Sequence, residues 1–441
     1  MSRRRLDFQV APGGQLRGRA RVPGDKSISH RSIMLAALAD GISEITGFLE
    51  GEDCLATLSA FRRMGVTIDG PDAGRVRVRG VGLRGLQAPE GPLDLGNSGT
   101  SMRLLAGLLA GQSFSSELIG DSSLSRRPMR RVTDPLTRMG ADIHCSAEGT
   151  PPLRIHGRAL QGLRYPMPVA SAQVKSCLLL AGLYAEGRTC VREPAPTRDH
   201  TERMLRGFGC QVQVEDGWIC VQGGQRLRPA GIEVPADISS VAFFLVGASI
   251  APGSDLLLEH VGLNATRSGV VEILRLMGAN IEILAAREVG GEPVADLRVR
   301  SATLHGIEIP RALVPLAIDE FPALFIAAAC ARGETVLAGA EELRVKESDR
   351  IQVMAEGLQA LGVAAAPLPD GIIIRGGAVG GGEVEARGDH RIAMSFAMAG
   401  LVAGGPLCVR DCANVETSFP GFAALARGCG LSLVEAHKEL P

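Results

Sequence analysis

The chain has 441 residues, more than one ordinary hydrophobic core accommodates, so two domains are expected. With 45% apolar residues, 22% charged residues and a formal net charge of −1, it carries no overall electrostatic footprint for nucleic acid or an anionic membrane surface. Any site for an anion must therefore come from local clusters of Lys and Arg.

The sequence carries no signal for export, membrane insertion or a common cofactor. No uninterrupted apolar run approaches the ~20 residues that span a bilayer, and no apolar stretch follows the basic start "MSRRR". We therefore expect a cytoplasmic protein with no membrane partner. No P-loop, dinucleotide fingerprint or H-E-x-x-H motif occurs, so no cofactor is expected.

The ten cysteines are scattered singly, and Cys408 and Cys412 come nearest to a pair. Because neither C-x-x-C nor a mixed Cys/His spacing occurs, the pattern favours unpaired thiols in a reducing compartment. It also predicts no metal site.

In chain order, the predicted elements repeat six times. Ala/Leu-rich segments that begin at polar turns predict helices in "SISHRSIMLAALADG", "SGTSMRLLAGLLAG", "SAQVKSCLLLAGLYAEG", "DISSVAFFLVGASIAPG", "DEFPALFIAAACARG" and "DHRIAMSFAMAGLVAGG". Each ends near a glycine, and these glycines lie 66–80 residues apart at Gly41, Gly111, Gly187, Gly253, Gly333 and Gly404. A second marker follows 22–29 residues later and reads "RRMGVTI", "TRMGADI", "RGFGCQV", "RLMGANI", "QALGVAA" and "RGCGLSL". Its glycine is the expected C′ residue of a second helix, where a positive φ costs nothing.

Alternating apolar and polar residues after each second marker predict a pair of strands, as in "ADIHC" with "LRIHG". The repeated unit is therefore helix, strand, helix, strand, strand. Three units per domain predict an N-terminal domain over residues 23–235 and a C-terminal domain over 1–22 and 236–441. We expect the chain to cross between them near "RVPGD" and "GIEVPAD", so that the first strand, before Pro23, completes the C-terminal domain.

The start of each first helix suits both capping and anion binding. Each carries a Ser, Thr or Asp, and in "GDKSISHR" we expect a serine to cap the helix. Helix N-termini also offer free N–H groups and a partial positive charge to phosphates and carboxylates. If the helices run alike inside each domain, two sets of three N-termini face one cleft.

Charged residues gather at four equivalent turns of this repeat. The clusters are Lys26 with Arg31; Arg126, Arg127, Arg130 and Arg131; Lys346, Glu347, Asp349 and Arg350; and Arg387, Asp389, His390 and Arg391. Any one alone is typical of a solvated surface, whereas four at equivalent turns favour one anionic site. Lys346 and Arg350 share a face if they lie on one helix. Asp319 is open to two interpretations, an N-cap or a catalytic base in a cationic cleft.

Nine motifs occur in the order found in the EPSP synthase (3-phosphoshikimate 1-carboxyvinyltransferase) family of enolpyruvyl transferases. They are "PGDKSISHR", "LGNSGTSMR", "RRPM", "SAQVKSCLLLAGL", "RDHTE", "DEFPAL", "KESDR", "GDHRIAMS" and "TSFPGF". The chain resembles that family over nearly its whole length. The resemblance implies an α/β fold of two inside-out domains, each of three repeated β-α-β-α-β-β units, with the active site in the cleft between them. It also implies a monomer without a cofactor.

The family reaction, EC 2.5.1.19, joins phosphoenolpyruvate to the 5-hydroxyl of shikimate 3-phosphate and releases phosphate, a step toward chorismate and the aromatic amino acids. The resemblance implies that shikimate 3-phosphate is bound by Lys26, Ser27, Arg31, Ser171, Ala172, Gln173, Arg198, Asp319 and Lys346. It implies that phosphoenolpyruvate is bound by Lys26, Gly99, Arg127, Gln173, Arg350 and Arg391. We expect Asp319 to act as the base toward the hydroxyl, and Glu347 and Lys26 to transfer protons at C3 and to the leaving phosphate.

Three positions depart from family patterns or stay unassigned. Gly99 stands where herbicide-insensitive members typically have Ala, so we expect glyphosate to compete with phosphoenolpyruvate. Thr417 stands where some relatives carry a Lys near phosphoenolpyruvate, so no lysine role is assigned there. For His30 we expect local hydrogen bonding rather than catalysis.

Two alternatives remain open. An enolpyruvyl transferase acting on UDP-N-acetylglucosamine commonly has a loop Cys before an "x-R-P" turn, and this chain has Ser122 at the corresponding place in "GDSSLSRRP". A non-enzymatic repeat scaffold that binds anionic partners explains the repeats. It does not explain why Asp319 and Glu347 lie among arginines, since carboxylates weaken simple anion binding.

Overall fold

The computed structural model describes residues 4–439, which fall into two compact units. The N-terminal unit comprises Gly24–Val234 and Val289–Glu292, and the C-terminal unit comprises Met1–Pro23, Pro235–Glu288 and Pro293–Pro441. Pro23 and Pro235, which the sequence analysis gave to the N-terminal domain, belong to the C-terminal unit. The excursion of residues 289–292 into the N-terminal unit had no signal in the sequence.

The N-terminal unit consists of three repeats of helix, strand, helix, strand, strand. Its helices are α1 (Lys26–Leu38), α2 (Glu52–Arg63), α3 (Gly99–Ala110), α4 (Arg130–Arg138), α5 (Ala172–Gly182) and α6 (His200–Gly207). Its strands are β3 (Ile42–Thr46), β4 (Thr67–Asp72), β5 (Arg75–Arg79), β6 (Leu93–Asp94), β7 (Ser115–Ile119), β8 (Asp142–His144), β9 (Leu153–His156), β10 (Leu160–Gln161), β11 (Arg164–Pro166), β12 (Ala185–Glu186), β13 (Arg188–Arg192), β14 (Val212–Glu215), β15 (Trp218–Gln222) and β16 (Gly231–Glu233).

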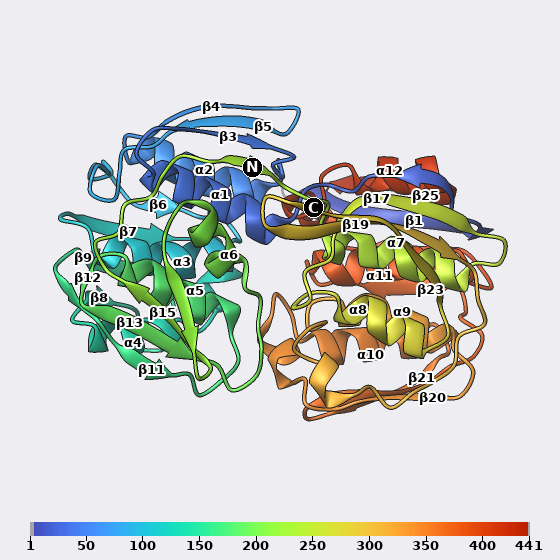
Figure 1. Cartoon of the computed structure of the whole chain (residues 1–441). Coiled ribbons are helices and arrows are strands. Elements are labelled where there is room, and N and C mark those ends of the chain that lie inside the picture. Colours follow the sequence, from blue (N-terminus) through green and yellow to red (C-terminus); the bar gives the residue numbers. More distant parts are fainter. Residues whose placement is uncertain (1–3, 440–441) are drawn as a thin grey trace. The chain divides into compact units, whose positions relative to one another are not determined.

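Each repeat forms one four-stranded sheet, in the orders β16-β3-β5-β4, β6-β7-β9-β8 and β11-β13-β15-β14. The first pair in each sheet is parallel and the other two pairs are antiparallel. The helices α1, α3 and α5 lie inside this ring of sheets (Figure 1). Every residue of α3 except Thr100 is buried, as expected for a helix that is apolar on all sides. The unit is therefore inside-out, with sheets around a helical core.

The C-terminal unit repeats this plan and borrows strands from the N-terminus. Its helices are α7 (Ile238–Ile250), α8 (Gly269–Leu276), α9 (Phe321–Cys330), α10 (Arg350–Ala360), α11 (His390–Ala399) and α12 (Phe422–Cys429). Its strands are β1 (Arg4–Gly14), β2 (Arg17–Ala20), β17 (Asp255–Gly262), β18 (Asn280–Val289), β19 (Glu292–Arg300), β20 (Glu334–Leu337), β21 (Ala364–Leu368), β22 (Gly371–Arg375), β23 (Gly382–Glu385), β24 (Leu407–Arg410) and β25 (Leu431–Glu439).

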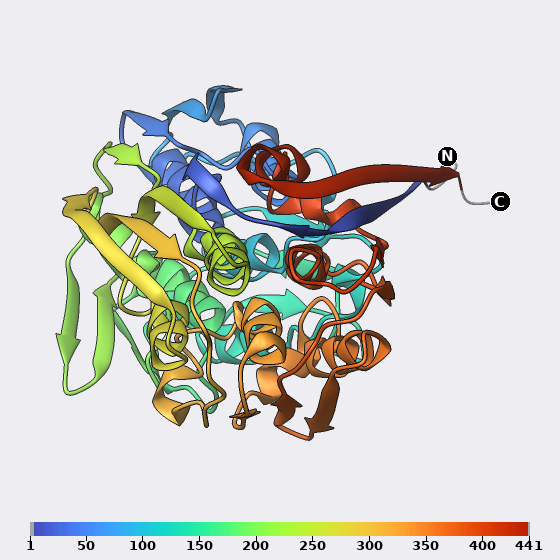
Figure 2. The same ribbon diagram turned by 90° about the vertical axis from the view of Figure 1, so that its right-hand side faces the viewer.

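Two N-terminal strands, where one was expected, complete sheets of this unit. The sheet orders are β18-β19-β17-β2, β20-β22-β21 and β23-β24-β1-β25. Figure 2 shows β1, in dark blue, alongside β25, in red, with which it pairs antiparallel. Strand β1 occupies the position that the last strand of the sixth repeat would fill, so the two ends of the chain build one sheet.

The six marker glycines that were predicted to end the second helices all adopt positive φ. The angles are +86° at Gly65, +90° at Gly140, +84° at Gly209, +96° at Gly278, +80° at Gly362 and +119° at Gly430. This confirms that the repeated glycine marks a helix end, because residues with a Cβ rarely adopt such angles.

The caps of the first helix of each repeat differ from the prediction at two helices, since α9 has no side-chain cap and α1 is capped by an unexpected residue. Asp25, and not a serine, caps α1, and its side chain accepts the N–H of Ile28 at 2.9 Å. The other side-chain caps are Ser98 on α3, Ser171 on α5, Asp237 on α7 and Asp389 on α11. Since the helix already begins at Lys26, the serines of "KSISH" lie inside it and are available for other contacts.

The cysteines also differ from the prediction, because Cys190 and Cys220 form a disulfide. The two residues lie directly opposite each other on the antiparallel strands β13 and β15, with Cα atoms 4.1 Å apart. They are 30 residues apart in sequence, so no local spacing indicated the pair. The other eight cysteines, all within the described residues, form no disulfide with one another.

Candidate active site

One group of residues, termed the α1–α3–α5 cluster, lies on or next to the N-terminal ends of α1, α3 and α5. Its members are Lys26, Ser27, Arg31, Gly99, Arg103, Arg127, Gln173 and Arg198. All but Arg103 were singled out from the sequence. Hydrogen bonds link Arg31 and Arg198 to Ser27, and link Arg103 to Gly99 and Gln173.

A bridge between α3 and α5 fixes Gln173 from both ends of its amide. Arg103 Nη1 donates to Gln173 Oε1 at 2.6 Å, and Gln173 Nε2 donates to Thr100 Oγ1 at 3.0 Å. Arg103 also donates to the carbonyl of Pro128 at 3.2 Å, next to the predicted site residue Arg127. Arg127 in turn donates to Asn97 Oδ1 at 2.6 Å. These contacts hold three predicted segments, "LGNSGTSMR", "RRPM" and "SAQVK", in one arrangement.

Arg31 forms hydrogen bonds with the first turn of α1 and with residues of α5 and α6. Its guanidinium donates to the Ser27 carbonyl at 2.9 Å, to Thr201 Oγ1 at 2.7 Å and to Ser176 Oγ at 2.7 Å. The residue is 3% exposed. Arg198 donates to Ser27 Oγ at 3.4 Å, and its residue is partly exposed. The structure thus places Arg198 nearer the surface of the cluster and Arg31 beneath it.

Gly99 leaves space that any larger residue would fill. A Cβ built at this position would lie 3.0 Å from Nη1 of Arg103 and 3.0 Å from Nη1 of Arg127. That is tighter than ordinary van der Waals contact, so an alanine would press on both guanidiniums. Because Gly99 has no side chain, the guanidiniums of Arg103 and Arg127 can both lie close to the start of α3.

The C-terminal unit carries a second group, termed the Arg350 cluster and formed by Asp319, Lys346, Glu347, Arg350 and Asp389. Arg350 is 1% exposed and donates from its three nitrogens to Asp389 Oδ2 at 2.8 Å, Asp319 Oδ1 at 3.3 Å and Glu347 Oε2 at 2.6 Å. Lys346 Nζ lies 3.3 Å from Asp319 Oδ1. One buried guanidinium therefore organises three carboxylates.

The pKa of Arg350 reflects this environment. Burial lowers it, but attraction to Asp389, Glu347 and Asp319 outweighs burial and raises the pKa above its already high ordinary value. Arg350 is therefore a permanent cation. Because a buried cation without partners would be very costly, the three carboxylates and Arg350 depend on one another.

The structure answers two questions about this cluster that the sequence left open. Lys346 and Arg350 do not share a helix, since α10 begins at Arg350 and Lys346 follows the short 3-10 helix Glu341–Val345. Both nevertheless reach Asp319. Asp319 is also not an N-cap, because α9 begins at Phe321, after Glu320, and no side chain caps it. Its carboxylate is engaged in ion pairs instead.

The remaining predicted residues lie at helix starts. Ser171 caps α5 by accepting the N–H of Val174 at 3.4 Å, and Ala172 is the first residue of that helix. Arg391 lies in the first turn of α11, where its N–H donates to Asp389 Oδ1 at 2.9 Å. Arg391 is thus tied through Asp389 to the Arg350 cluster.

The sequence did not indicate the roles of two residues that organise these clusters, Arg103 and Asp389, or of Lys175, a buried cation outside them. Arg103 lies one turn after Gly99 inside a quoted motif, and this i, i+4 spacing was the available signal. Asp389 was read as part of a charged run, but it is 0% exposed and bonds to Arg350. Lys175, 1% exposed, lies 2.7 Å from Glu202 Oε1 and 3.0 Å from Glu193 Oε2, and its partners are too distant in sequence to suggest this.

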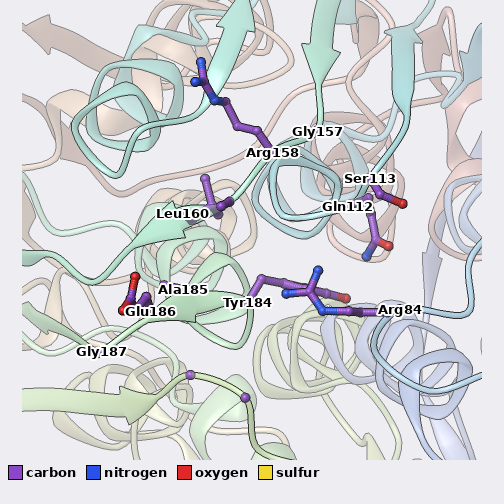
Figure 3. A pocket seen from close by; sticks show the side chains of 13 residues that line it. Arg84, Gln112, Ser113, Gly157, Arg158, Leu160, Tyr184, Ala185, Glu186 and Gly187 are labelled. Carbon is purple, nitrogen blue, oxygen red and sulfur yellow. The ribbon is translucent and has the colours of Figure 1, made fainter.

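A pocket of about 680 Å³ in the N-terminal unit lies away from these residues (Figure 3). Its lining includes Gln112 and Tyr184, which follow the C-terminal ends of α3 and α5. At about 1.5 Å per residue, α3 separates this pocket from the α1–α3–α5 cluster by roughly 18 Å. Among residues 4–439, no group of His, Cys, Asp and Glu suited to a metal ion occurs. No helix within that range is long and apolar enough to cross a membrane.

Comparison with known proteins identifies the family to which the chain belongs. The model of a family described as EPSP synthase (3-phosphoshikimate 1-carboxyvinyltransferase) matches residues 10–425. A 3-phosphoshikimate 1-carboxyvinyltransferase of Nitrosococcus oceani is 70% identical over 429 residues, which cover 97% of each chain. A solved EPSP synthase from Acinetobacter baumannii superposes with a TM-score of 0.88 at 56% identity, over 98% of this chain and 100% of that one.

A more distant solved structure shares the fold alone. The enolpyruvyl transferase NikO from Streptomyces tendae has a TM-score of 0.80 at 17% identity, over 99% of this chain and 100% of that chain. The two-unit repeat architecture is therefore found in proteins whose sequences differ greatly from this one.

Proposed function

Because the chain belongs to the EPSP synthase family, we propose that its two polar clusters bind the substrates of the family reaction and carry out its proton transfers. The chain is a 3-phosphoshikimate 1-carboxyvinyltransferase. It transfers the enolpyruvyl group of phosphoenolpyruvate to the 5-hydroxyl of shikimate 3-phosphate. The products are 5-enolpyruvylshikimate 3-phosphate and phosphate. Both substrates carry a phosphate and a carboxylate, which suits the concentration of cations in the α1–α3–α5 cluster.

Shikimate 3-phosphate is assigned to the hydroxyl and amide groups around α1 and α5. Lys26, Ser27 and Arg198 supply donors at the start of α1, while Ser171, Ala172 and Gln173 do so at the start of α5. The N-terminus of each helix adds unpaired backbone N–H groups. Arg31 is assigned with Ser27, whose carbonyl it holds. Asp319 and Lys346 complete the set of residues predicted to contact this substrate.

Phosphoenolpyruvate is assigned to the residues around Gly99. Arg127 and Gln173 are held by Asn97 and Arg103, so their donors are oriented before substrate arrives. Lys26, Arg350 and Arg391 are the other predicted contacts. Since Gly99 has no side chain, no Cβ crowds the guanidiniums of Arg103 and Arg127.

The proton transfers are assigned to Asp319, Glu347 and Lys26. The substrate 5-hydroxyl forms a bond to C2 of phosphoenolpyruvate while its proton passes to Asp319 and C3 gains a proton. The C2–O bond to phosphate then breaks, and C3 loses a proton to restore the double bond. Cationic partners favour the ionised carboxylate that a base requires, and Lys346 and Arg350 both contact Asp319. Glu347 and Lys26 serve C3 and the leaving phosphate.

The observation that carries these assignments is the Arg350 cluster, in which two of the three predicted acid–base groups are held with a permanent cation. The test is phosphate release by purified protein supplied with shikimate 3-phosphate and phosphoenolpyruvate together and separately. Release that requires both substrates, with formation of the enolpyruvyl ether, is the expected result. Release with UDP-N-acetylglucosamine as the acceptor, or no release at all, would contradict it.

Inhibition by glyphosate is also proposed, because position 99 carries no methyl group that would press on the guanidiniums of Arg103 and Arg127. Glyphosate is expected to compete with phosphoenolpyruvate because it is a small anion that fits the same donors. Full activity at millimolar glyphosate would count against this. That the enzyme acts as a cytoplasmic monomer stays a prediction, which light scattering at assay concentration and cell fractionation test directly.

A further inference from the structure

A chain of buried hydroxyl groups links α1, α2 and α3 behind the predicted substrate residues. His30 Nδ1 lies 2.8 Å from Thr57 Oγ1, which lies 2.6 Å from Ser101 Oγ. Ser101 Oγ in turn lies 2.6 Å from Oγ of Ser98, the cap of α3. His30, Thr57 and Ser101 are 0% exposed, and Ser98 is 1% exposed. The chain thus runs from the second turn of α1 to the N-terminus of α3.

The second ring nitrogen of His30 indicates the direction of these hydrogen bonds. Nε2 is buried and has no hydrogen-bond partner among the described residues. Because an unpaired buried N–H is rarer than an unpaired acceptor, we assign the proton to Nδ1. Nδ1–H then donates to Thr57, the Thr57 hydroxyl to Ser101, and the Ser101 hydroxyl to Ser98. Ser98 Oγ also accepts the backbone N–H of Ser101 at 3.1 Å.

The ring of His30 is neutral as well as buried. Burial lowers its pKa well below the ordinary value, and the charges of Lys26 and Arg31 lower it further. His30 is therefore a hydrogen-bond donor and adds no charge to the cations of the α1–α3–α5 cluster.

This hydrogen-bonded chain of side chains lies one helical turn after Lys26 on α1, a residue that is assigned to substrate. Lys26 precedes His30 by four residues on α1, and Asp53 precedes Thr57 by four residues on α2. The Lys26 ammonium contacts the Asp53 carboxylate, so the two helices meet at two successive levels. Gly99 lies between Ser98 and Ser101 at the start of α3. Because of this arrangement, we expect a change in the contacts of Thr57 with His30 and Ser101 to shift the helix ends that carry Lys26 and Gly99.

We propose that His30 is a positioning residue for the enolpyruvyl transfer, acting through Thr57 and Ser101 to hold Lys26 and Gly99 in register. This rests on the assignment of Lys26 and Gly99 to substrate in the proposed function. His30 itself touches neither substrate. Its role is to fix the positions of the N-termini of α1, α2 and α3 relative to one another. Placement errors near 1 Å can cost about 10²-fold in rate.

The test compares substitutions along the chain by steady-state kinetics with both substrates varied. Thr57→Val removes one hydroxyl at constant shape and is expected to lower kcat/KM for phosphoenolpyruvate about tenfold. His30→Leu is expected to lose at least as much. His30→Asn carries an amide near the place of Nδ1 and is expected to restore most of the loss, whereas the amide of His30→Gln reaches toward Nε2 and is not. The double variant His30→Leu with Thr57→Val should lose less than the product of the two single effects.

Ile33→Ala is the matched control, since Ile33 lies on the same helix, is 0% exposed and is part of the hydrophobic core. It is expected to lower the melting temperature while leaving kcat/KM within about twofold at a temperature where it is folded. If Ile33→Ala loses as much activity as Thr57→Val, or if folded Thr57→Val keeps wild-type kinetics, the proposal is overturned. Lys26→Met separates this from the function proposal, because unchanged kinetics in that variant would refute the substrate assignment itself.

Discussion

Arg31 and Arg103 of the α1–α3–α5 cluster donate hydrogen bonds to neutral oxygens, whereas Arg350 of the Arg350 cluster donates to three carboxylates. Arg103 bonds to an amide and a carbonyl, and Arg31 to two hydroxyls and a carbonyl. Arg350 instead meets Asp319, Glu347 and Asp389. Neutral partners orient a guanidinium without cancelling its charge, while carboxylates cancel it.

The difference indicates a division of labour between the two units. The α1–α3–α5 cluster contains more cations than carboxylates even though Lys26 is paired with Asp53, and an excess of cations attracts phosphates and carboxylates. A cluster with excess carboxylate attracts anions poorly but holds groups that accept and return protons. Binding should therefore be most sensitive to changes in the α1–α3–α5 cluster, and turnover and stability to changes in the Arg350 cluster.

The largest effect is expected from Arg350→Leu. It leaves Asp389, which is 0% exposed, and two further carboxylates without their shared cation. Losing one partner of a buried ion pair typically costs about 3–5 kcal/mol, a large part of a domain's stability. Thermal or denaturant unfolding measures this. The control is Arg375→Leu, because Arg375 pairs with Glu334 on an exposed face of the same unit and should change stability little. Equal losses in the two variants would argue against the central role of Arg350.

Asp319→Ala sharpens the comparison by removing one carboxylate and keeping Arg350 paired with the others. Turnover is expected to fall at least ~10²-fold, with substrate binding retained. Single-turnover kinetics and equilibrium binding of shikimate 3-phosphate measure the two separately. Glu342→Ala is the matched change, since Glu342 also lies near Lys346, at 3.9 Å, and it should leave turnover nearly unchanged. Weakened binding with full turnover at saturation would show that Asp319 only positions substrate.

Gly99→Ala tests the α1–α3–α5 cluster in the same way. The added methyl group would lie 3.0 Å from the guanidiniums of Arg103 and Arg127 and displace both slightly. Such overpacking typically costs about 1–3 kcal/mol, so the inhibition constant for glyphosate should rise about tenfold or more. The KM for phosphoenolpyruvate is expected to rise, with kcat changed little. A fall in kcat at unchanged KM would show that Gly99 affects turnover rather than binding. That result would contradict the assignment of binding to the α1–α3–α5 cluster.

Features encoded by local repetition could be predicted from sequence. The six marker glycines, such as Gly65 and Gly430, identified helix ends because each needs a positive φ that depends only on its own backbone. The sixfold unit followed from their spacing, and the family motifs gave the fold. The choice between Asp25 and a serine as the cap of α1 was missed because both are good caps and the helix starts one residue earlier than expected.

Features that depend on distant partners could not be predicted. The disulfide of Cys190 and Cys220 depends on the register between β13 and β15. The bond from Arg103 to Gln173 spans 70 residues, and that from Arg350 to Asp389 spans 39. In each case the sequence supplies the residue types, but tertiary packing selects which pairs meet. His30 is the clearest example, since local hydrogen bonding was expected and its partners come from α2 and α3.

The smallest expected effect is a pH dependence of stability that arises from His30. The folded pKa of His30 lies well below its ordinary value of 6.5, chiefly because the ring is buried. Below pH 6.5 the unfolded chain therefore binds a proton at this position that the folded chain does not. The stability tied to the neutral ring is fully present above pH 6.5 and is lost as the pH falls toward the folded pKa.

His30→Asn removes this titration while keeping a donor near Nδ1. The melting temperature of the variant minus that of wild type should therefore increase as the pH falls from 7 to 5. The slope attributable to His30 is at most about 1.4 kcal/mol per pH unit. Taking the difference between the two proteins cancels the titration of every other group, including the carboxylates of the Arg350 cluster. Parallel curves for wild type and variant would mean that His30 takes up its proton over the same pH range in the folded chain as in the unfolded chain. Once protonated, the imidazolium of His30 would add a positive charge next to the α1–α3–α5 cluster. The first donor to Thr57 would then be a cation.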